Sequence, residues 1–312
     1  MRKTILGRTG LSVTIAGLGG GGHSRLGMAK YGQDHAAGLI RQAYESGVNF
    51  FDTAAAYGTE PAFGQGLSGL PRQSYVLSTK FTYSSQSGVK SGEDLMLALE
   101  NSLRALRTDY VDVYHIHGVR PEKYSQVAER LYPALEKAKQ QGKIRFPGIT
   151  EAFGSDTAHE MLTQALVDDL FDVIMVGYNL LNPSAAKTVL PTAREKNLGV
   201  LCMFAVRSAL SNPAQLAVDI QRILERGQAD PPLVKGAQSL AFLTEKGVAG
   251  SIMEAAYRYC SHTDGVHVTL TGTGSPKHLE ENLRSISLPP LPEETLERLE
   301  TLFGRVDCVS GQ

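Results

Sequence analysis

Short apolar runs and helical segments alternate along this chain, and that alternation constrains the fold more than any other feature. Starting at Ile15, a strand-like run is followed by a helical segment eight times. Parallel strands need such connecting helices, and eight units in order favour a closed barrel over an open sheet. The predicted strands are residues 15–19, 48–52, 75–80, 111–117, 144–150, 172–178, 199–204 and 266–271. The predicted helices are residues 34–47, 61–70, 93–106, 124–141, 156–167, 185–196, 252–260 and 276–286.

The segments outside these units complete the predicted architecture. Residues 5–13, ILGRTGLSV, have the pattern of a hairpin that plugs one end of the barrel. Residues 293–303 form a last helix, and residues 207–250 are irregular apart from a helical stretch at 213–226, which predicts an extended loop over the active end. We therefore expect one domain, residues 1–312, with a (β/α)₈ TIM-barrel fold, an N-terminal β-hairpin and an additional C-terminal helix.

Composition indicates a protein that acts on small molecules. The net charge is −1, from 31 basic and 32 acidic residues, so nothing attracts nucleic acid or an anionic membrane surface. The sequence starts without the apolar segment of a signal peptide, and no run approaches the length that spans a bilayer, which predicts a cytoplasmic protein. Three cysteines without paired spacing predict neither a disulfide framework nor a four-cysteine zinc site.

Polar residues end three of the predicted strands. VNFFDTAAAY carries Asp52 and, one short loop later, Tyr57; YVLSTK ends in Lys80, and VDVYHIH ends in His117. Taken alone, an Asp after a strand is as well explained by a helix cap, and a Tyr by a surface position. Barrel enzymes place their catalytic groups at the carboxyl ends of the strands, so the repetition predicts that these four side chains converge.

Several motifs together resemble the aldo-keto reductases over nearly the whole chain. They are LGRTGLSV, GVNFFDTAAAYG, YVLSTK, DYVDVYHIHG, YNLLNP and GTGSPKHLEEN. The resemblance implies an oxidoreductase that transfers hydride between a nicotinamide cofactor, NADP or NAD, and a small carbonyl or alcohol substrate such as an aldehyde, ketone or aldose. Neither the physiological direction nor the oligomeric state follows from it.

The same resemblance implies roles for the four strand-end residues. Tyr57 is the general acid or base, and because a free tyrosine titrates near 10, a cation close by has to stabilise its anion. Lys80 is that cation, and Asp52 holds Lys80 and compensates its buried charge. His117 orients and polarises the substrate oxygen.

The resemblance also implies a cofactor site. Family members hold the nicotinamide amide with Ser, Asn and Gln, where this chain has Thr150, Glu151 and Met175; Glu151 could accept from the amide, whereas Met175 offers no useful hydrogen bond. Met203 stands where an aromatic ring often stacks on the nicotinamide, beside Phe204. The other predicted cofactor contacts are Gly20, Gly21, Asp52, Ala205, Val206, Arg207 (to the pyrophosphate), Gly272, Thr273, Gly274, Lys277, His278, Glu281 and Asn282.

The adenosine end of that site decides between the two cofactors. Gly272, Thr273 and Gly274 form a glycine turn before a predicted helix N-terminus, which suits a phosphate. Only Lys277 and His278 are cationic there, so the sequence leaves the choice between NADP and NAD open.

Substrate contacts are predicted from His23, Phe81, Tyr83, Arg120 and residues 207–235. The segment after the last helix, 304–312, is short compared with some relatives. This favours an open pocket for small polyols, sugars or simple aldehydes over one for steroids. Arg120 would suit an anionic or hydroxyl-rich substrate, and equally a surface salt bridge.

Three other functions remain open at this stage. His115 and His117 share one face of a strand, as the metal ligands of a barrel hydrolase would, although His115 also fits a core position. Lys80 alone would fit a Schiff-base aldolase. Channel-associated subunits share the fold, which leaves a non-catalytic regulatory subunit as the third.

Overall fold

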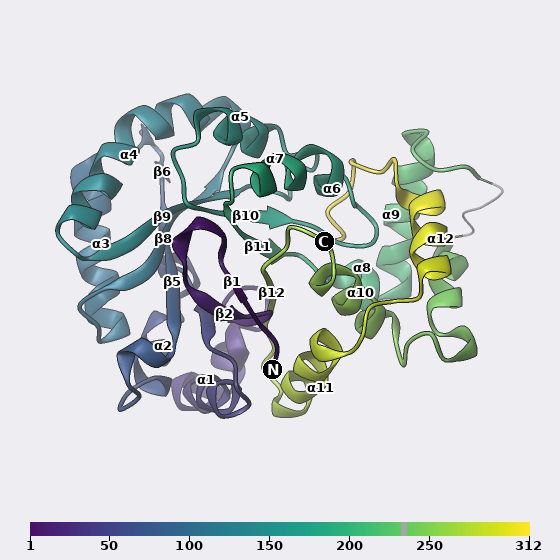
Figure 1. Cartoon of the computed structure of the whole chain (residues 1–312), viewed down its shortest axis with the longest axis horizontal. Helices are drawn as coiled ribbons and strands as arrows, with labels where there is room; N and C mark the ends of the chain where they lie inside the picture. Colours follow the sequence, from purple (N-terminus) through teal and green to yellow (C-terminus); the bar gives the residue numbers. More distant parts are fainter. Residues whose placement is uncertain (232–235) are drawn as a thin grey trace.

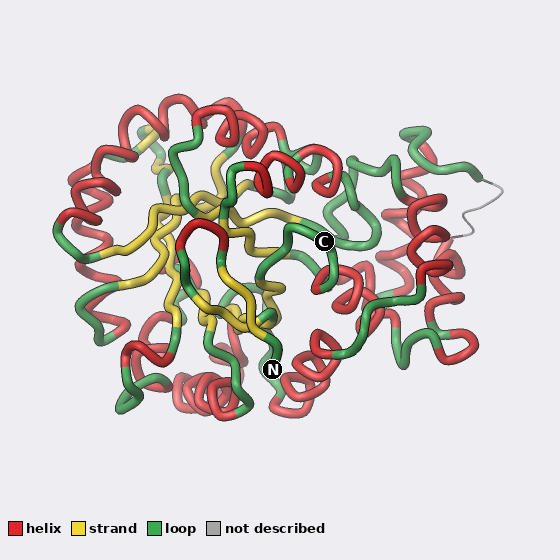
Figure 2. Tube along the Cα trace, in the orientation of Figure 1, coloured by secondary structure: helices red, strands yellow, loops and turns green. Residues whose placement is uncertain are grey.

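A closed barrel of eight parallel strands with helices around it makes up most of the molecule (Figures 1 and 2). The computed structural model describes residues 1–231 and 236–312. The strands follow one another around the barrel in chain order, which confirms the predicted (β/α)₈ fold. They are β3 (Ala16–Gly19), β4 (Phe50–Asp52), β5 (Val76–Thr82), β8 (Val111–Val119), β9 (Ile144–Glu151), β10 (Val173–Gly177), β11 (Gly199–Met203) and β12 (Val268–Thr271).

The helices form the outer layer. The second ends four residues before its predicted end, at Gly66, and the fifth begins four residues after its predicted start, at Glu160, and two others differ in a way that the backbone explains. The first helix begins six residues early and bends at Gly32, whose φ of 83° is outside the helical region. The predicted helix 185–196 is two short helices that meet at Val189, just before Pro191. The layer consists of α1 (Met28–Glu45), α2 (Glu60–Gly66), α3 (Gly92–Leu106), α4 (Tyr124–Gln140), α5 (Glu160–Asp168), α6 (Ala185–Thr188), α7 (Leu190–Glu195), α10 (Ile252–Ser261) and α11 (Pro276–Ser287).

The predicted N-terminal hairpin is confirmed, with β1 (Lys3–Ile5) antiparallel to β2 (Ser12–Thr14). Its Leu6, Leu11 and Val13 are buried in one cluster with barrel residues such as Phe50 and Val268. Since these apolar side chains fill the interior of the barrel from that end, the hairpin closes it, and a ligand has access only from the opposite end.

The described parts of residues 207–250, which are 207–231 and 236–250, do not form the extended loop over the active end that the sequence predicted. The described part is largely helical, with α8 (Ser208–Ser211) and α9 (Pro213–Glu225), and it lies beside the barrel next to α12 (Glu293–Phe303) (Figure 1). Apolar side chains of α9, α10 and α12 form a second buried cluster there. The apolar face of α9 is thus buried in a cluster that also contains side chains of α10 and α12.

Register brings the polar strand ends to one rim. Asp52 pairs with Ser78 across β4 and β5, and Lys80 pairs with His115 across β5 and β8. A short hairpin of β6 (Ser84–Ser85) and β7 (Gly88–Val89) follows β5 at the same rim. No helix in the part of the chain that the structure describes is long and apolar enough to cross a bilayer.

Candidate active site

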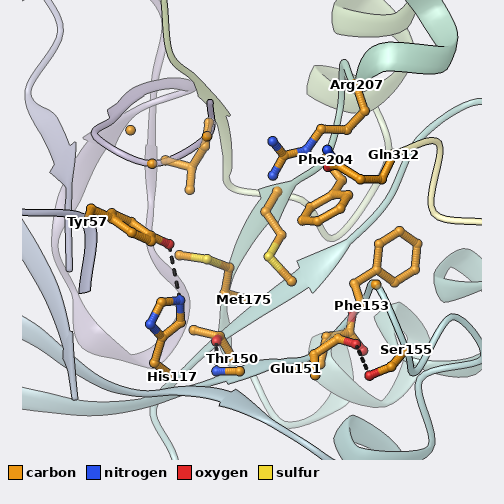
Figure 3. Close-up of a pocket in the computed structure, with 18 of the residues that line it drawn as sticks. Tyr57, His117, Thr150, Glu151, Phe153, Ser155, Met175, Phe204, Arg207 and Gln312 are labelled. Carbon is orange, nitrogen blue, oxygen red and sulfur yellow. Dashed lines mark hydrogen bonds between the residues drawn. The ribbon is translucent and has the colours of Figure 1, made fainter. Parts of the chain in front are cut away.

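A cavity of about 1010 Å³ opens at the carboxyl ends of the strands, where the sequence predicted the site. Side chains from several strands and loops point into it (Figure 3). The predicted site residues that line it are Gly21, His23, Asp52, Tyr57, Tyr83, His117, Arg120, Thr150, Glu151, Met175, Met203, Phe204, Ala205, Val206, Arg207 and Gly272.

Lys80 lies beneath the cavity in a buried ion pair. Its Nζ donates to Asp52 Oδ2 at 2.5 Å and to the Thr53 carbonyl at 2.7 Å, while Asp52 Oδ1 accepts from the Ser78 hydroxyl at 2.8 Å. Burial tends to lower the pKa of Lys80, but the Asp52 carboxylate and the Tyr57 phenol more than offset this and raise the pKa above its usual value. Lys80 is therefore a fixed cation below the phenol.

Tyr57 stands between this cation and the cavity. The Lys80 Nζ lies 5.0 Å from the centroid of the Tyr57 ring, and the Tyr57 hydroxyl lies 3.1 Å from His117 Nε2 (Figure 3). The loop after β3 packs against the ring, since a Cβ on Gly21 would come within 2.9 Å of it. Gly20 and Gly21 thus let this loop approach the turn that follows β4, and the structure brings all four predicted catalytic residues together.

His117 is a neutral group in this arrangement. Burial, together with the Lys80 charge, lowers the pKa of His117 from 6.5 to about 3. Its imidazole can therefore share a hydrogen bond with the phenol at neutral pH without adding a second positive charge next to Lys80.

This shifted pKa predicts acid lability. The unfolded chain binds a proton at His117 below about pH 6.5, whereas the native protein does so only near about pH 3. The free energy of unfolding therefore decreases as the pH falls through that window. We expect His117→Gln to lose less of that free energy between about pH 7 and about pH 4 than the wild type does, in urea titrations at both pH values. An equal loss in both proteins would contradict the neutral assignment.

The residues predicted to face the nicotinamide amide differ in what they offer. Thr150 Oγ1 accepts from the Gly118 N–H at 2.7 Å, which leaves its own proton to donate into the cavity. Met175 lies beside Thr150 in the register of β9 and β10 and lines the cavity with its thioether, which offers no useful hydrogen bond, as predicted.

The Glu151 carboxylate is not available to a ligand. Its side chain has no exposed surface, and its oxygens accept from His159 Nδ1 and from the Gly177 N–H. Burial raises the pKa of Glu151, and the hydrogen bond from His159 opposes that rise. The prediction that this carboxylate accepts from the nicotinamide amide is therefore not supported; Glu151 acts on the cavity through its backbone and its partners.

Phe204 and Arg207 form the wall after β11. Phe204 has a φ of 66°, and the Arg207 guanidinium lies 3.8 Å from the centroid of its ring, so one ring face is already covered. Arg207 lines the cavity, and its Nε has no hydrogen-bond partner among the residues that the structure describes. A cation without a bound acid at a cavity wall is suited to an anionic group.

The residues predicted for the adenosine end mostly lie outside the cavity. Gly272 and Gly274 let the loop before α11 touch the loop after β3, since added Cβ atoms would lie 2.5 Å from the Gly19 carbonyl oxygen and 2.9 Å from the Gly27 Cα. Lys277 is exposed and lies 3.7 Å from Glu281. The residues of this group that do not line the cavity are Thr273, Gly274, Lys277, His278, Glu281 and Asn282, and Gly20 likewise does not line it.

Three of the four predicted substrate residues, His23, Tyr83 and Arg120, line the cavity. Phe81 does not, because it follows Lys80 on β5: strand alternation sends Lys80 inward and Phe81 outward, where it is buried in the core between barrel and helices. Within residues 207–231, only Arg207, Ser208 and Ser211 reach the cavity, and the predicted contacts at 232–235 fall outside the described residues.

The sequence interpretation missed several lining residues, and two groups of them shape the cavity most clearly. One is Phe153, Gly154 and Ser155 after β9, for which a glycine next to an aromatic residue at a strand end was the available indication. The other is Gln312: the tail after α12 returns to the barrel mouth, where the Gln312 side chain lies 3.1 Å from His23. The tail is short but narrows the mouth on this side, which modifies the expected open pocket.

The geometry disfavours two of the alternatives. The His115 ring is buried against Gly148, where a Cβ would lie 2.3 Å from its Nδ1, and it does not line the cavity, so His115 and His117 do not present a joint metal site. No cluster of three His, Cys, Asp or Glu side chains suited to a metal occurs in residues 1–231 and 236–312. Lys80 is already bound by Asp52 and is no free amine for a Schiff base.

Comparisons with known proteins agree with this geometry. The model of the aldo/keto reductase family matches residues 17–303. L-galactose dehydrogenase of Arabidopsis thaliana is 29% identical over 96% of this chain and 93% of its own length, and the uncharacterized oxidoreductase YqkF of Bacillus subtilis is 25% identical over 96% of both.

Solved structures resemble the whole chain as well. The holo form of the aldo-keto reductase AKR11C1 from Bacillus halodurans has a TM-score of 0.75 at 25% identity, covering 99% of this chain and 98% of that one. The thermostable aldo-keto reductase Tm1743 in complex with epalrestat has a TM-score of 0.69 at 24% identity, covering 96% and 99%. The chain is thus an oxidoreductase and belongs to the aldo/keto reductase family.

Proposed function

We propose that the protein interconverts a small, hydroxyl-rich carbonyl compound and its alcohol with NADP or NAD, using Tyr57 as the general acid and base. The observation that carries this proposal is the placement of Tyr57, whose hydroxyl lies 3.1 Å from His117 while Lys80 lies 5.0 Å from the centre of its ring. One phenol is thus in contact with a neutral hydrogen-bonding group and next to a fixed cation, at the wall of a cavity large enough for a cofactor and a small substrate.

Tyr57 moves the proton in either direction. During reduction its hydroxyl donates a proton to the substrate oxygen, and the Lys80 ammonium stabilises the phenolate that remains. During oxidation the phenolate accepts the hydroxyl proton of the alcohol. Asp52 keeps Lys80 in position, and neutral His117 donates to or accepts from the same oxygen and so orients the substrate.

The residues present fit a nicotinamide dinucleotide. When bound, the cofactor supplies or accepts the hydride at the substrate carbon. Thr150 has a free hydroxyl proton for the carboxamide oxygen, Met175 and Met203 provide apolar walls for the ring, and Arg207 has an unpartnered Nε for the pyrophosphate. Gly21, Asp52, Phe204, Ala205, Val206 and Gly272 complete this wall, and the residues before and in α11 would receive the adenosine end.

The substrate side of the cavity favours a polar molecule. Besides His23, Tyr83 and Arg120, this side is lined by residues that carry hydroxyl groups. They are Ser84 and Ser85 of the β6–β7 hairpin and Ser155 of the loop after β9. Such groups satisfy the hydroxyls of a sugar, whereas they would be left without partners against a steroid. The likeness to L-galactose dehydrogenase supports an aldose, or its oxidised form, as the substrate class.

A matrix of both cofactors against small aldehydes, aldoses and their alcohols tests the proposal, with nicotinamide absorbance as the readout. We expect turnover of at least one aldose or polyol, and kcat/KM for it at least about tenfold above that for an apolar aldehyde of similar size. Absence of turnover with every pair would contradict the proposed activity.

Discrimination between the two cofactors should be modest. Lys277 is exposed and shares its charge with Glu281, so no buried pair of cations awaits a 2′-phosphate among the described residues. We expect the ratio of NADPH to NADH kcat/KM to stay below about a thousand, or roughly 4 kcal/mol. Steady-state kinetics with each cofactor at saturating substrate give this ratio, and a larger value would show that residues outside the predicted set bind the phosphate.

A further inference from the structure

A fully buried pair, Glu151 and His159, lies behind the cavity and has no part in the proposed chemistry. Glu151 ends β9, and His159 precedes α5; neither side chain has any exposed surface. The His159 Nδ1 lies 3.0 and 2.9 Å from the two Glu151 oxygens, and the Gly177 N–H donates to Oε1 at 2.7 Å. The carboxylate is therefore surrounded by donors.

The hydrogen bonds beyond this pair fix the proton on His159 Nε2. Asn182 donates through Nδ2 to the Thr157 and Val309 carbonyls, which fixes its amide so that Oδ1 is an acceptor. The Ser184 hydroxyl donates its single proton to that Oδ1 at 2.6 Å. The Ser184 oxygen, 3.0 Å from His159 Nε2, is then left as an acceptor, so Nε2 must carry the proton.

The other ring nitrogen then needs a proton as well. A neutral imidazole protonated at Nε2 would direct a bare Nδ1 at two carboxylate oxygens, and the lone pairs would repel. Since the Gly177 N–H donates to the same carboxylate, the ionised acid is the form that the surroundings stabilise. We propose that His159 is held as an imidazolium ion by Glu151, and that this ion pair positions the floor and one wall of the cavity. The positioning role rests on the proposed cofactor site.

The floor of the cavity depends on the Glu151–His159 pair because β9 and β10 stop pairing at this point. Backbone pairing between β9 and β10 ends at Thr150 and Met175. One residue further along β9, the Glu151 side chain takes over and spans the gap to the Gly177 N–H. Thr150 and Met175, the predicted neighbours of the nicotinamide, are thus held in register by a side chain that His159 neutralises.

The wall depends on His159 directly. The Phe153 ring stacks on the imidazole with centroids 5.3 Å apart and planes 12° from parallel, and Phe204 meets Phe153 edge-on at 5.3 Å. Phe153 fits only because residue 177 is a glycine, where a Cβ would lie 2.0 Å from the ring. The proposed His159 imidazolium interacts with the face of the Phe153 ring by a cation–π contact, and the Phe204 ring makes the same kind of contact with the Arg207 guanidinium.

Few other charges act on this pair. Asp156 raises the pKa of Glu151 by repulsion, but its own carboxylate accepts from the N–H groups of Glu160 and Met161 at the start of α5. The 179–184 loop contributes Ser184 and Asn182, which are neutral, and β10 contributes a backbone N–H. Loss of the imidazolium proton at alkaline pH would therefore leave one uncompensated buried charge next to Asp156.

Nitrogen NMR of the protein without cofactor tests the protonation state. Long-range proton–nitrogen correlation spectra of the wild type, compared with those of His159→Leu, identify the His159 ring. We expect both ring nitrogens to be of the protonated type at neutral pH. A bare Nδ1 or Nε2 at neutral pH would overturn the proposal.

Cofactor titrations test the positioning role. We expect His159→Leu, which leaves an unpaired buried carboxylate, to weaken NADH and NADPH binding by about tenfold or more, with kcat at saturating cofactor changed less than about threefold. Glu151→Gln, which keeps His159, should retain most of the wild-type affinity, because the amide accepts from the Gly177 N–H and donates to a neutral imidazole.

His262→Gln is the matched control, because His262 Nε2 donates to the Leu288 carbonyl beside a different cavity, and its removal should not change cofactor affinity. If His159→Leu does not fold, the cofactor affinity of Glu151→Gln decides. Unchanged affinity in His159→Leu, or a loss of about tenfold or more in Glu151→Gln, would overturn the positioning role. If the wild type binds neither cofactor, the proposed function fails, while the NMR result on His159 still stands.

Discussion

Replacing Tyr57 with Phe should lower kcat by about a thousandfold or more and leave cofactor affinity within about threefold of the wild type. General acid–base catalysis by one positioned group contributes about 10²- to 10⁴-fold, and Tyr57 is the group next to both Lys80 and His117. The ring stays in place, because Phe fills the same space beside Gly21. Steady-state kinetics and cofactor fluorescence titrations measure the two quantities.

Tyr44→Phe provides the control for this change. It also removes one phenol oxygen, but that hydroxyl bonds Ser74 on the outer layer and does not line the cavity. Its kcat should match that of the wild type. A Tyr57→Phe variant that keeps more than about a tenth of the wild-type kcat would remove tyrosine from the acid role.

The second large effect concerns stability as well as activity. Lys80→Met removes the ion-pair partner of the buried Asp52 carboxylate and leaves it the hydrogen bond from the Ser78 hydroxyl, so we expect it to lower the free energy of unfolding by about 3–5 kcal/mol. Turnover should fall by about a hundredfold or more, since Tyr57 loses its neighbouring cation. Urea denaturation and kinetics at saturating substrate measure both effects.

The double variant Asp52→Asn with Lys80→Met separates the two causes. Removing both charges removes the unpaired carboxylate, so most of the lost stability should return, while turnover stays low. The opposite pattern, activity returning with the double change, would show that Lys80 serves the fold and not the proton transfer.

The fold could be predicted from the sequence because the local pattern of apolar residues is enough to identify most of the barrel strands. Runs such as 172–178 are apolar on both faces, and each is followed by a helical segment, which determines a parallel barrel almost alone. The prediction for residues 207–250 failed because apolar side chains of α9 share a buried cluster with those of α10 and α12, which lie far away in the sequence, and no local pattern specifies that cluster.

The site divides in the same way. Asp52, Tyr57, Lys80 and His117 could be found because each lies within a few residues of the carboxyl end of a strand, and parallel register brings strand ends together. The assignment of Phe81 to the substrate pocket was wrong because it ignored strand alternation, which turns the residue after Lys80 to the opposite face of β5. His159 could not be found at all, because its partner Glu151 seemed to face the ligand, and only the positions of Gly177 and Ser184 show where the carboxylate points.

Transfer of deuterium from the nicotinamide ring to the product tests the central claim most directly. The protein is given reduced cofactor labelled at the transferring position together with the best aldehyde or aldose from the substrate matrix, and the alcohol is analysed by mass spectrometry. The account predicts one deuterium on the former carbonyl carbon with the wild type, and at least about a thousandfold slower appearance of that product with Tyr57→Phe. Product without the label, or labelled product formed equally fast by Tyr57→Phe, would contradict it.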